Sequence, residues 1–280
     1  MKDYEKQVHW YYDLTTQAYQ DFWGEHLHFF FWNNNQTRKQ AIAQTNKTII
    51  KDAKITKQSN VLDAGCGIGS LSILIAKTHG CQVTGVNIHK PHIAIAKKRA
   101  GSLPISFVHQ DLMSLSLDST YDAICYIDVE PHIPDKTKVI KNLANHLKPG
   151  GRLVMTAYLS NENATLLQKK LLIDPLCHYG AFPYLGTFSE YKKAFTHANV
   201  KPTIFKDSTK QMKKCVDHFY SHALKLCNTQ LHKQMMNAFT NTTLLKAAVK
   251  GKVVDQIEAA FLGVIYAKLC LDAGAMQLGY

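Results

Sequence analysis

An alternation of short apolar runs with helix-compatible segments between residues 58 and 158 restricts the fold of this 280-residue chain more than any other feature. The apolar runs are rich in β-branched side chains, which is typical of buried strands. They cover residues 60–64, 81–86, 105–108, 121–127 and 152–158. Helices are predicted between them, including residues 71–77 and 134–147. We therefore predict an α/β fold with a doubly wound, mostly parallel, Rossmann-like sheet that is covered by helices on both faces.

The segments that flank this core differ from it. Residues 1–50 are aromatic and polar with helical character, residues 159–198 and 211–272 are mostly helical, and residues 200–209 are predicted to form one more strand. We see no internal repeat and no Ser/Pro linker. We expect a single domain over residues 1–280, with an N-terminal aromatic lid (1–50), a core (51–158 and 187–210) and a helical cap (159–186 and 211–272).

Composition narrows the class of protein. Hydrophobic residues make up 46% and charged residues 19%, as in globular proteins. The net charge is +12, but almost all basic residues are lysines and no long basic block occurs. We interpret this charge as a solvated surface rather than a nucleic-acid site, and leave attraction to an anionic substrate or a membrane surface open. No stretch reaches the ~20 apolar residues of a transmembrane helix, and no secretory signal is visible. Seven scattered cysteines favour a reducing compartment, so we predict a cytoplasmic location.

The most informative stretch is the glycine-rich turn after the first predicted strand, VLDAGCGIG at residues 61–69. Glycines at this place allow a sharp turn and a close approach of a ligand to main-chain N–H groups. The spacing is GxGxG, which differs from the GxGxxG of pyrophosphate-binding folds. Asp63 precedes the first glycine by two residues, and a carboxylate there suits a ligand with an ammonium or hydroxyl group.

Polar side chains follow three further predicted strands. Asn87 ends the second strand, where it can hydrogen-bond ribose hydroxyls, and Asp111 follows the third, where it can accept a hydrogen bond from an adenine amino group. Asp128 closes the fourth strand. Because the carboxyl ends of parallel strands line one crevice, we expect these side chains to converge with Asp63 on one site.

Several stretches resemble, in order, the motifs of class I S-adenosylmethionine-dependent methyltransferases: VLDAGCGIG, QVTGVNI, HQDLMSL, YDAICYIDVEPHIPD and LKPGGRLVM. The N-terminal YYDLTTQAYQDFWGEHLHFFFW is similar to the segment before the core in the sterol C-methyltransferase and tocopherol methyltransferase branch, which includes small-molecule natural-product enzymes. SEYKKAFTHANVKPTIFK, at residues 189–206, resembles the late helix and sixth strand of that branch. The chain ends at Tyr280, where the family begins its seventh strand.

The resemblance implies S-adenosylmethionine as the cofactor. It places Asp63, Gly65 and Gly67 at the methionine part, Asn87 and Ile88 at the ribose and adenine, and Asp111 and Leu112 at the adenine. The full set of expected cofactor contacts is Tyr12, Asp63, Gly65, Cys66, Gly67, Asn87, Ile88, Gln110, Asp111, Leu112 and Asp128. The sequence departs from the family at Asn87, which stands where an acid is usual.

An acid–base element is expected after the fourth strand. His132 titrates near neutral pH and could accept a proton, and Glu130 could orient it or act alone. The sterol branch has an acid at the position of Asp128 and a histidine at that of His132, so Asp128 could take the role of Glu130. Tyr12 is expected to reach the reacting groups from the N-terminal segment.

Aromatic side chains of residues 1–50 are expected to form a lid and the wall of a substrate pocket, because aromatic faces attract the cationic methyl donor. The substrate contacts predicted among them and the neighbouring histidines are Tyr11, Trp23, His28 and Trp32. The fourteen histidines show no convincing ligand pattern, so we predict no metal site.

Three functions remain open from the sequence. The first is methyl transfer to a small, partly apolar acceptor, with a prenyl or sterol-like alkene favoured and an amine or hydroxyl possible. The second is cyclopropane formation on lipid alkenes, as in cyclopropane fatty acid synthases. The third is a non-enzymatic RNA-binding module on the same fold, against which the intact glycine turn and Asp63 argue. No nucleic-acid partner is expected, peripheral membrane contact is possible, and the sequence leaves the oligomeric state undefined.

Overall fold

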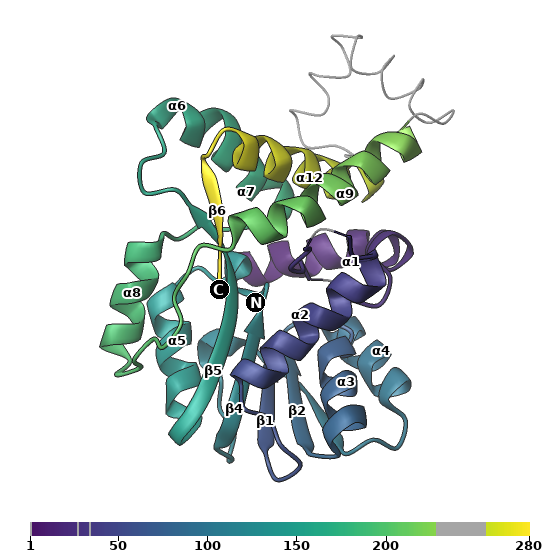
Figure 1. Ribbon diagram of the computed structural model, residues 1–280, viewed down its shortest axis with the longest axis vertical. Coiled ribbons are helices and arrows are strands. Elements are labelled where there is room, and N and C mark those ends of the chain that lie inside the picture. The colour runs from purple at the N-terminus through teal and green to yellow at the C-terminus, as the bar shows by residue number, and fades with distance from the viewer. Residues whose placement is uncertain (1, 27, 34, 228–255) are drawn as a thin grey trace.

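The computed structural model describes residues 2–26, 28–33, 35–227 and 256–280. Its centre is a six-stranded sheet with the strand order β3-β2-β1-β4-β5-β6 (Figure 1). The strands are β1 (Asn60–Ala64), β2 (Gln82–Asn87), β3 (Ile105–His109), β4 (Tyr121–Ile127), β5 (Leu147–Ser160) and β6 (Met276–Gly279). Strands β1 to β5 run parallel, and β6 pairs antiparallel with β5. The predicted doubly wound, mostly parallel α/β sheet is therefore confirmed.

Helices cover both faces of this sheet. The longer helices of the described residues are α1 (Asp3–Trp23), α2 (Arg38–Asp52), α3 (Ser70–His79), α4 (Lys90–Ala100), α5 (Lys136–Asn145), α7 (Asp174–Gly180), α8 (Phe188–His197), α9 (Thr209–Cys227) and α12 (Gln256–Asp272). Helices α2, α3 and α4 lie on one face and α5 and α8 on the other (Figure 1). Strand β4 shows why both faces are apolar: Ala123 and Cys125 pack toward α2 and α3, while Ile124 and Tyr126 pack toward α5 and α8.

Helix starts follow from local capping. Thr37 and Gln40 form a capping box at the start of α2, and Thr187 and Glu190 form another at the start of α8. The carboxylate of Asp135 accepts a hydrogen bond from the Lys138 N–H at the start of α5. Side chains in the sequence therefore fix where these helices begin.

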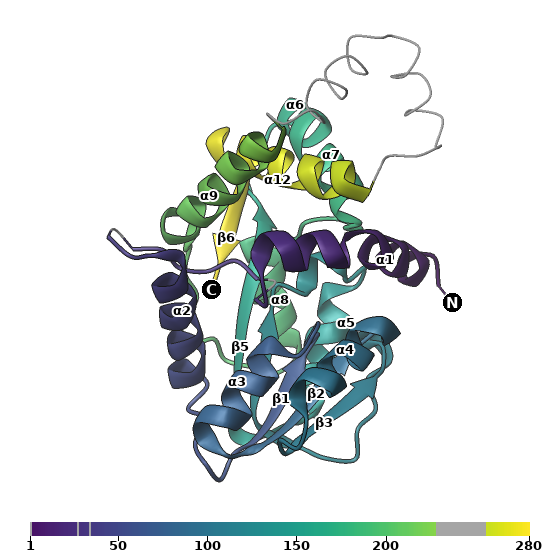
Figure 2. The same ribbon diagram turned by 90° about the vertical axis from the view of Figure 1, so that its right-hand side faces the viewer.

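The remaining helices lie beyond the carboxyl ends of the strands. Figure 2 shows α1 between the sheet and an outer layer of α7, α9 and α12, which also contains the short helix α6 (Leu166–Gln168). A π-helical turn at Lys169–Ile173 joins α6 to α7. Pro175 lacks an N–H group, so the regular helical hydrogen bond to Leu171 cannot form at this junction.

Two boundaries differ most from the prediction. Helix α5 ends at Asn145 instead of residue 147, and β5 begins at Leu147 instead of residue 152, so the strand includes the Lys-Pro-Gly-Gly stretch. A register shift against β4 between Tyr121 and Ala123, together with a left-handed φ of 78° at Gly150, accommodates that stretch inside the strand.

The strand predicted at residues 200–209 is wrong. The structure has only an isolated bridge there, between Asp207 and Gly279, and α9 begins at Thr209. Residues 276–279 occupy the edge of β5 instead, because β6 pairs with Ala157–Ser160 of that strand. The end of the sequence, where a seventh strand was expected to begin, thus supplies the sixth strand of this sheet.

Candidate functional site

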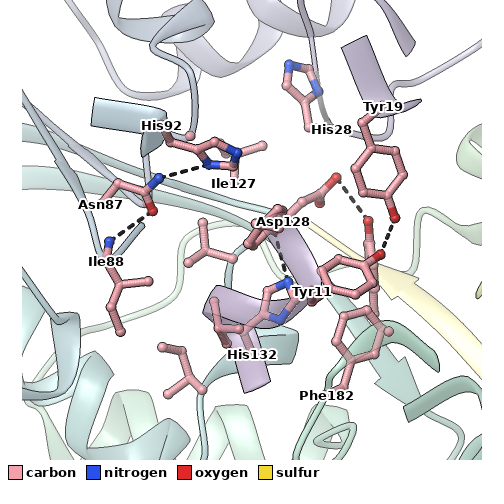
Figure 3. Close-up of a pocket in the computed structure, with 18 of the residues that line it drawn as sticks. Tyr11, Tyr19, His28, Asn87, Ile88, His92, Ile127, Asp128, His132 and Phe182 are labelled. Carbon is pink, nitrogen blue, oxygen red and sulfur yellow. Dashed lines mark hydrogen bonds between the residues drawn. The ribbon is translucent and has the colours of Figure 1, made fainter. Parts of the chain in front are cut away.

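A cavity of about 180 Å³ lies at the carboxyl ends of the strands, beneath α1. Strand ends and the turns that follow them form one side, which we call the cavity floor. Residues of α1, α7 and α12 form the other side, which we call the cavity roof. Most of the predicted site residues line this cavity, namely Tyr11, Tyr12, His28, Asp63, Gly65, Cys66, Gly67, Asn87, Ile88, Asp111, Leu112, Asp128 and His132. Figure 3 shows several of them converging from different elements.

Glu130 does not reach the cavity, contrary to the expectation that it takes part in acid–base chemistry. Its side chain is fully buried and accepts hydrogen bonds from the Tyr191 hydroxyl at 2.7 Å and the Tyr158 N–H at 2.6 Å. The Lys136 Nζ lies 3.5 Å from its Oε2. Burial raises the pKa of Glu130 and lowers the pKa of Lys136. Glu130 therefore links Tyr191, Tyr158 and Lys136 inside the core instead of facing the cavity.

Three further predicted residues are not placed at the cavity. The Gln110 amide donates a hydrogen bond to the Ser116 carbonyl and accepts one from the Ser116 N–H. The Trp32 indole donates to the Gln36 carbonyl at 2.9 Å and packs beside Phe30. The side chain of Trp23 lies outside the described side chains, so the structure gives it no place.

The glycine turn leaves an opening in the floor. The Gly65 and Cys66 N–H groups donate to the Val86 carbonyl, which ties the turn to β2. Gly65 has a left-handed φ of 84°, and a Cβ there would lie 2.2 Å from a methyl group of Val129. Gly67 also has a positive φ, of 51°, but no atom lies within 4 Å of the place of its absent Cβ. The turn is thus closely packed at Gly65 and open at Gly67, as a ligand cradle requires.

Asp63 supplies a buried carboxylate beside this turn. It is 3% exposed, and its Oδ2 accepts a hydrogen bond from the Ser72 hydroxyl at 2.5 Å. Burial raises the pKa of Asp63 to about 6, and the bond from Ser72 opposes that shift. A cationic group in the cavity would compensate the cost of burying this charge, so the floor fits the ammonium of a bound methionine moiety.

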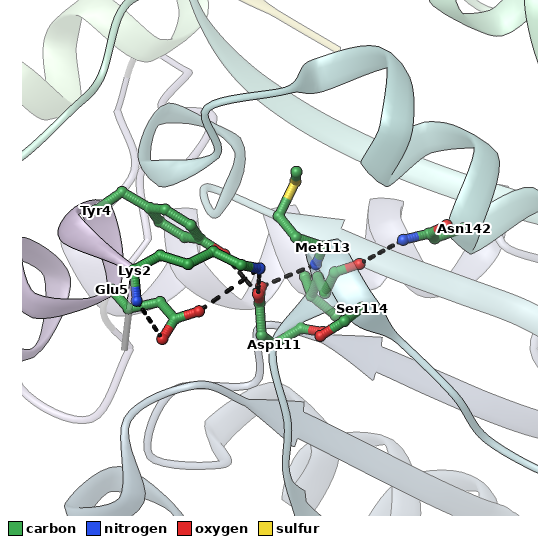
Figure 4. Close-up of polar contacts among 8 residues, drawn as sticks. Lys2, Tyr4, Glu5, Asp111, Met113, Ser114 and Asn142 are labelled. Atoms are coloured by element: carbon green, nitrogen blue, oxygen red, sulfur yellow. Dashed lines mark hydrogen bonds and ion pairs between the residues drawn. The ribbon is translucent and has the colours of Figure 1, made fainter.

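Asn87 and Asp111 continue the floor along β2 and β3. The Asn87 Oδ1 accepts a hydrogen bond from the Ile88 N–H at 3.0 Å. The Asp111 Oδ1 accepts from the Met113 N–H at 2.8 Å, and its Oδ2 accepts from the Tyr4 hydroxyl at 2.5 Å and lies 3.2 Å from the Lys2 Nζ (Figure 4). The first turn of α1 is therefore anchored to the side chain expected to contact adenine.

Tyr12 and His132 join the roof to the floor. His132 lies in a 3₁₀ turn after β4, and its Nε2 is 3.0 Å from the Tyr12 hydroxyl. Its Nδ1 is 3.2 Å from the Ala181 carbonyl, which can only accept, so Nδ1 carries the proton and Nε2 accepts from Tyr12. Burial lowers the pKa of His132 to about 4. The imidazole is therefore neutral at physiological pH, and its unprotonated Nε2 is directed at Tyr12.

Asp128 and His28 form a second polar group. Asp128 has a left-handed φ of 54° and accepts hydrogen bonds from the Phe29 N–H at 2.6 Å and the Thr156 hydroxyl at 2.5 Å. Burial raises the pKa of Asp128, and nearby His28 opposes the shift. The Nδ1 of His28 donates to the Phe29 carbonyl, while its buried Nε2 has no hydrogen-bond partner among the described residues. That nitrogen can accept a hydrogen bond from a bound molecule.

Sequence reasoning missed the lining aromatic residues Tyr4, Tyr158 and Phe182, whereas Tyr19 belongs to the aromatic segment that was expected to line the pocket. Tyr4 and Tyr19 belong to the inner face of α1, which also carries Val8, Tyr11 and Tyr12, and the hydroxyls of Tyr11 and Tyr19 hydrogen-bond to each other. Helical spacing along residues 4–19 could have identified this face. Tyr158 and Phe182 come from the end of β5 and the residues after α7, and Phe182 lies 5.0 Å from the His132 ring. Nothing in the sequence pattern pointed to Phe182.

The described residues contain no cluster of His, Cys, Asp and Glu side chains that could hold a metal ion. None of their helices is both long enough and apolar enough to span a membrane.

This sheet order, with a glycine turn after its first strand and polar groups at the following strand ends, defines a class of nucleotide-cofactor-binding α/β proteins. Comparison with known proteins narrows the class. Residues 61–151 match the family model described as methyltransferase domain. The sterol 24-C-methyltransferase of Eremothecium gossypii is 30% identical over 168 residues, which is 58% of this chain and 45% of that protein. The chain thus spans about half the length of the curated relatives it matches first.

Solved structures match over the whole fold. A mycolic acid cyclopropane synthase complexed with SAH and CTAB has a TM-score of 0.79 at 12% identity, covering 100% of this chain and 97% of that chain. A phosphoethanolamine N-methyltransferase from Haemonchus contortus has a TM-score of 0.72 at 14% identity, covering 100% and 59%. The resemblance found in the sequence is confirmed: the chain carries a class I S-adenosylmethionine-dependent methyltransferase domain.

Proposed function

We propose that this protein transfers a methyl group from S-adenosylmethionine to a small, partly apolar molecule bound in the cavity, with an alkene carbon as the favoured acceptor. The observation that carries the proposal is the juxtaposition, in one cavity, of the open glycine turn and Asp63 with the Tyr12–His132 pair. The first group suits a cationic cofactor, and the second suits removal of a proton from the acceptor.

The floor residues would hold the cofactor, which supplies a methyl group activated by a positively charged sulfur. Asp63 would bind the ammonium of its methionine part, and Gly67 would leave room for its chain. Asn87 would hydrogen-bond the ribose. Asp111 would accept from the adenine amino group, sharing its carboxylate with Tyr4. Each of these residues lines the cavity.

The basicity of His132 favours carbon over nitrogen or oxygen. An imidazole whose pKa burial lowers to about 4 is a weak base for an alcohol or an ammonium ion. An alkene that attacked the methyl carbon would form a C–C bond as the bond from that carbon to sulfur broke. The alkene would acquire a positive charge, and the carbon next to that charge would lose a proton readily. His132 would take this proton at Nε2, directly or through the Tyr12 hydroxyl. The buried Asp128 carboxylate and the faces of Tyr158 and Phe182 would stabilise the positive charge.

The proposal is tested by incubating the purified chain with S-adenosylmethionine that carries a trideuterated methyl group and a panel of acceptors: a prenyl alkene, a sterol, an alkylamine and a phenol. We expect a labelled product from an alkene. Labelled product only from the amine or phenol would replace the carbon acceptor by nitrogen or oxygen, and no binding of the cofactor in calorimetry would refute the proposal.

Cyclopropane formation is the second candidate, favoured by the match to the cyclopropane synthase over the whole chain. In that reaction the base removes a proton from the newly added methyl group, so the product retains two deuterons and shows ring protons in its NMR spectrum. A product that retains all three deuterons excludes ring closure. A cytoplasmic location and the expected lack of a nucleic-acid partner stay predictions from the sequence.

A further inference from the structure

His92 is a buried histidine of the floor that the proposed chemistry does not use. It lies in the first turn of α4, is 1% exposed and lines the cavity behind Asn87. Its Nδ1 is 3.2 Å from the Asn87 Nδ2, and its Nε2 is 2.8 Å from the Thr16 hydroxyl of α1. Figure 3 shows the imidazole against the Asn87 amide, on the side opposite Ile88. Thr16 of α1 is therefore linked to Asn87 through the imidazole of His92.

The donors and acceptors in this chain can be assigned. The Thr16 hydroxyl donates its proton to the Tyr12 carbonyl one helical turn earlier, so it accepts from His92. The proton of His92 is then on Nε2, and Nδ1 is left as an acceptor for the Asn87 N–H. Burial lowers the pKa of His92 to about 3, which keeps the ring neutral and preserves that lone pair.

The amide of Asn87 is thereby fixed from both ends. The Nδ1 of His92 requires the amide nitrogen on its side, and the Ile88 N–H requires the amide oxygen on the other. Two independent contacts select the same orientation. One N–H and one lone pair of the amide remain for the cavity, and this donor–acceptor couple matches two adjacent hydroxyl groups, each of which can accept and donate.

We propose that His92 is a positioning residue that holds the Asn87 amide in the orientation required by the ribose hydroxyls of the cofactor, an inference that rests on the proposed function. It also explains why an asparagine stands where the family usually has an acid. A carboxylate at position 87 would direct an oxygen at the lone pair on Nδ1, whereas an amide offers an N–H. Asn87 and His92 are a matched pair, and Thr16 sets the tautomer.

The first test compares the binding of S-adenosylhomocysteine with that of its 2′,3′-dideoxy analogue by calorimetry. We expect the unaltered chain to prefer the ribose form roughly ten-fold, as two neutral hydrogen bonds would give. Asn87→Ala and His92→Phe should both lose most of this preference, although His92→Phe retains Asn87. His92→Asn, whose amide oxygen can replace Nδ1 as acceptor, should restore part of it.

His89→Phe is the matched control, because His89 is equally buried and lies edge-on to His92, with ring centroids 4.4 Å apart, but bonds to Asp13. It should keep the preference. An undiminished preference in His92→Phe would overturn the inference. If His92→Phe does not fold, the Asn87 and Thr16 variants described next test the inference without altering His92. Failure of the unaltered chain to bind either ligand would refute the proposed function itself.

The second test uses compensation between distant residues. Asn87→Asp alone should weaken the binding of S-adenosylhomocysteine roughly ten-fold. Adding Thr16→Val removes the acceptor for Nε2, so the proton can move to Nδ1 and be donated to the introduced carboxylate. The double variant should therefore bind more tightly than Asn87→Asp alone. Effects of the two substitutions that simply add in free energy would show that Thr16 does not act through His92.

Discussion

The floor and the roof of the cavity are held in place in different ways. Asp63 lies in β1 and the glycine turn follows this strand, which is paired on both sides in the middle of the parallel sheet, so main-chain hydrogen bonds fix their position. Helix α1 is joined to the floor by side chains instead: Tyr4 to Asp111, Tyr12 to His132 and Thr16 to His92. We therefore expect substitutions in the floor to have large effects, and substitutions in the roof to have effects that depend on which side-chain contact is removed.

The largest expected effect lies where floor and roof meet. His132→Ala should lower turnover by about 100-fold or more, because it removes the proton acceptor, and should leave the affinity for S-adenosylhomocysteine unchanged. Steady-state kinetics and calorimetry measure the two quantities. Tyr12→Phe keeps the imidazole and removes only the hydroxyl, so it should cost less. Full turnover in His132→Ala would remove His132 from the mechanism.

A change in the floor alone should act on binding. Asp63→Ala leaves the cofactor ammonium without its buried partner, so we expect S-adenosylhomocysteine to bind about 100-fold more weakly or not at all. Asp122→Ala is a suitable control. This more exposed carboxylate lies at the end of β4 that is remote from the cavity, where it pairs with Lys148. An unchanged dissociation constant in Asp63→Ala would contradict the proposed cofactor site.

The floor should also make binding depend on pH. Because burial raises the pKa of Asp63 to about 6, this carboxyl group is ionised above that value and becomes neutral as the pH falls through it. Loss of the negative charge weakens the pairing with the ammonium, so affinity should be constant above pH 7 and fall by up to about ten-fold per pH unit below 6. Calorimetry from pH 5 to 8 measures this. The same slope in Asp63→Asn would assign the effect to another group.

The smallest effect is expected from the anchor at the start of the roof. Tyr4→Phe removes one partly buried hydrogen bond to Asp111, which is worth about 0.5–1.5 kcal/mol, and should speed hydrogen exchange in α1 a few-fold. Lys2→Gln should change nothing measurable, because the ammonium of Lys2 is exposed. Equal effects of the two variants would show that the charge of Lys2 holds α1 as strongly as the phenol hydroxyl of Tyr4 does.

The same contrast explains what could be predicted from the sequence. The carboxyl ends of parallel strands meet at one edge, so strand positions alone were enough to bring Asp63, Asn87, Asp111 and Asp128 together. The prediction for Glu130 was wrong because Asp128 adopts a left-handed backbone conformation. The chain changes direction there, and the Glu130 side chain is buried in the core instead of facing the cavity.

Contacts between distant segments were beyond reach. Thr16 and His92 are 76 residues apart and Tyr4 and Asp111 are 107 apart, and no local pattern encodes such pairs. Residues 200–209 show the converse error: their composition suits a strand, but β6 holds the edge of β5, and only Asp207 of this segment forms a bridge to β6. Local propensity predicts what a segment can form, and competition for partners decides what it does form.

The position of β6 has a consequence for biosynthesis. Met276 begins this strand and also lines the cavity, so neither the sheet edge at Ala157–Ser160 nor the site is complete before the ribosome has released residues 276–279. While the predicted helical cap is being synthesised, the nascent chain therefore exposes the unpaired edge of β5. That interval is when chaperones would engage it and when aggregation competes with folding.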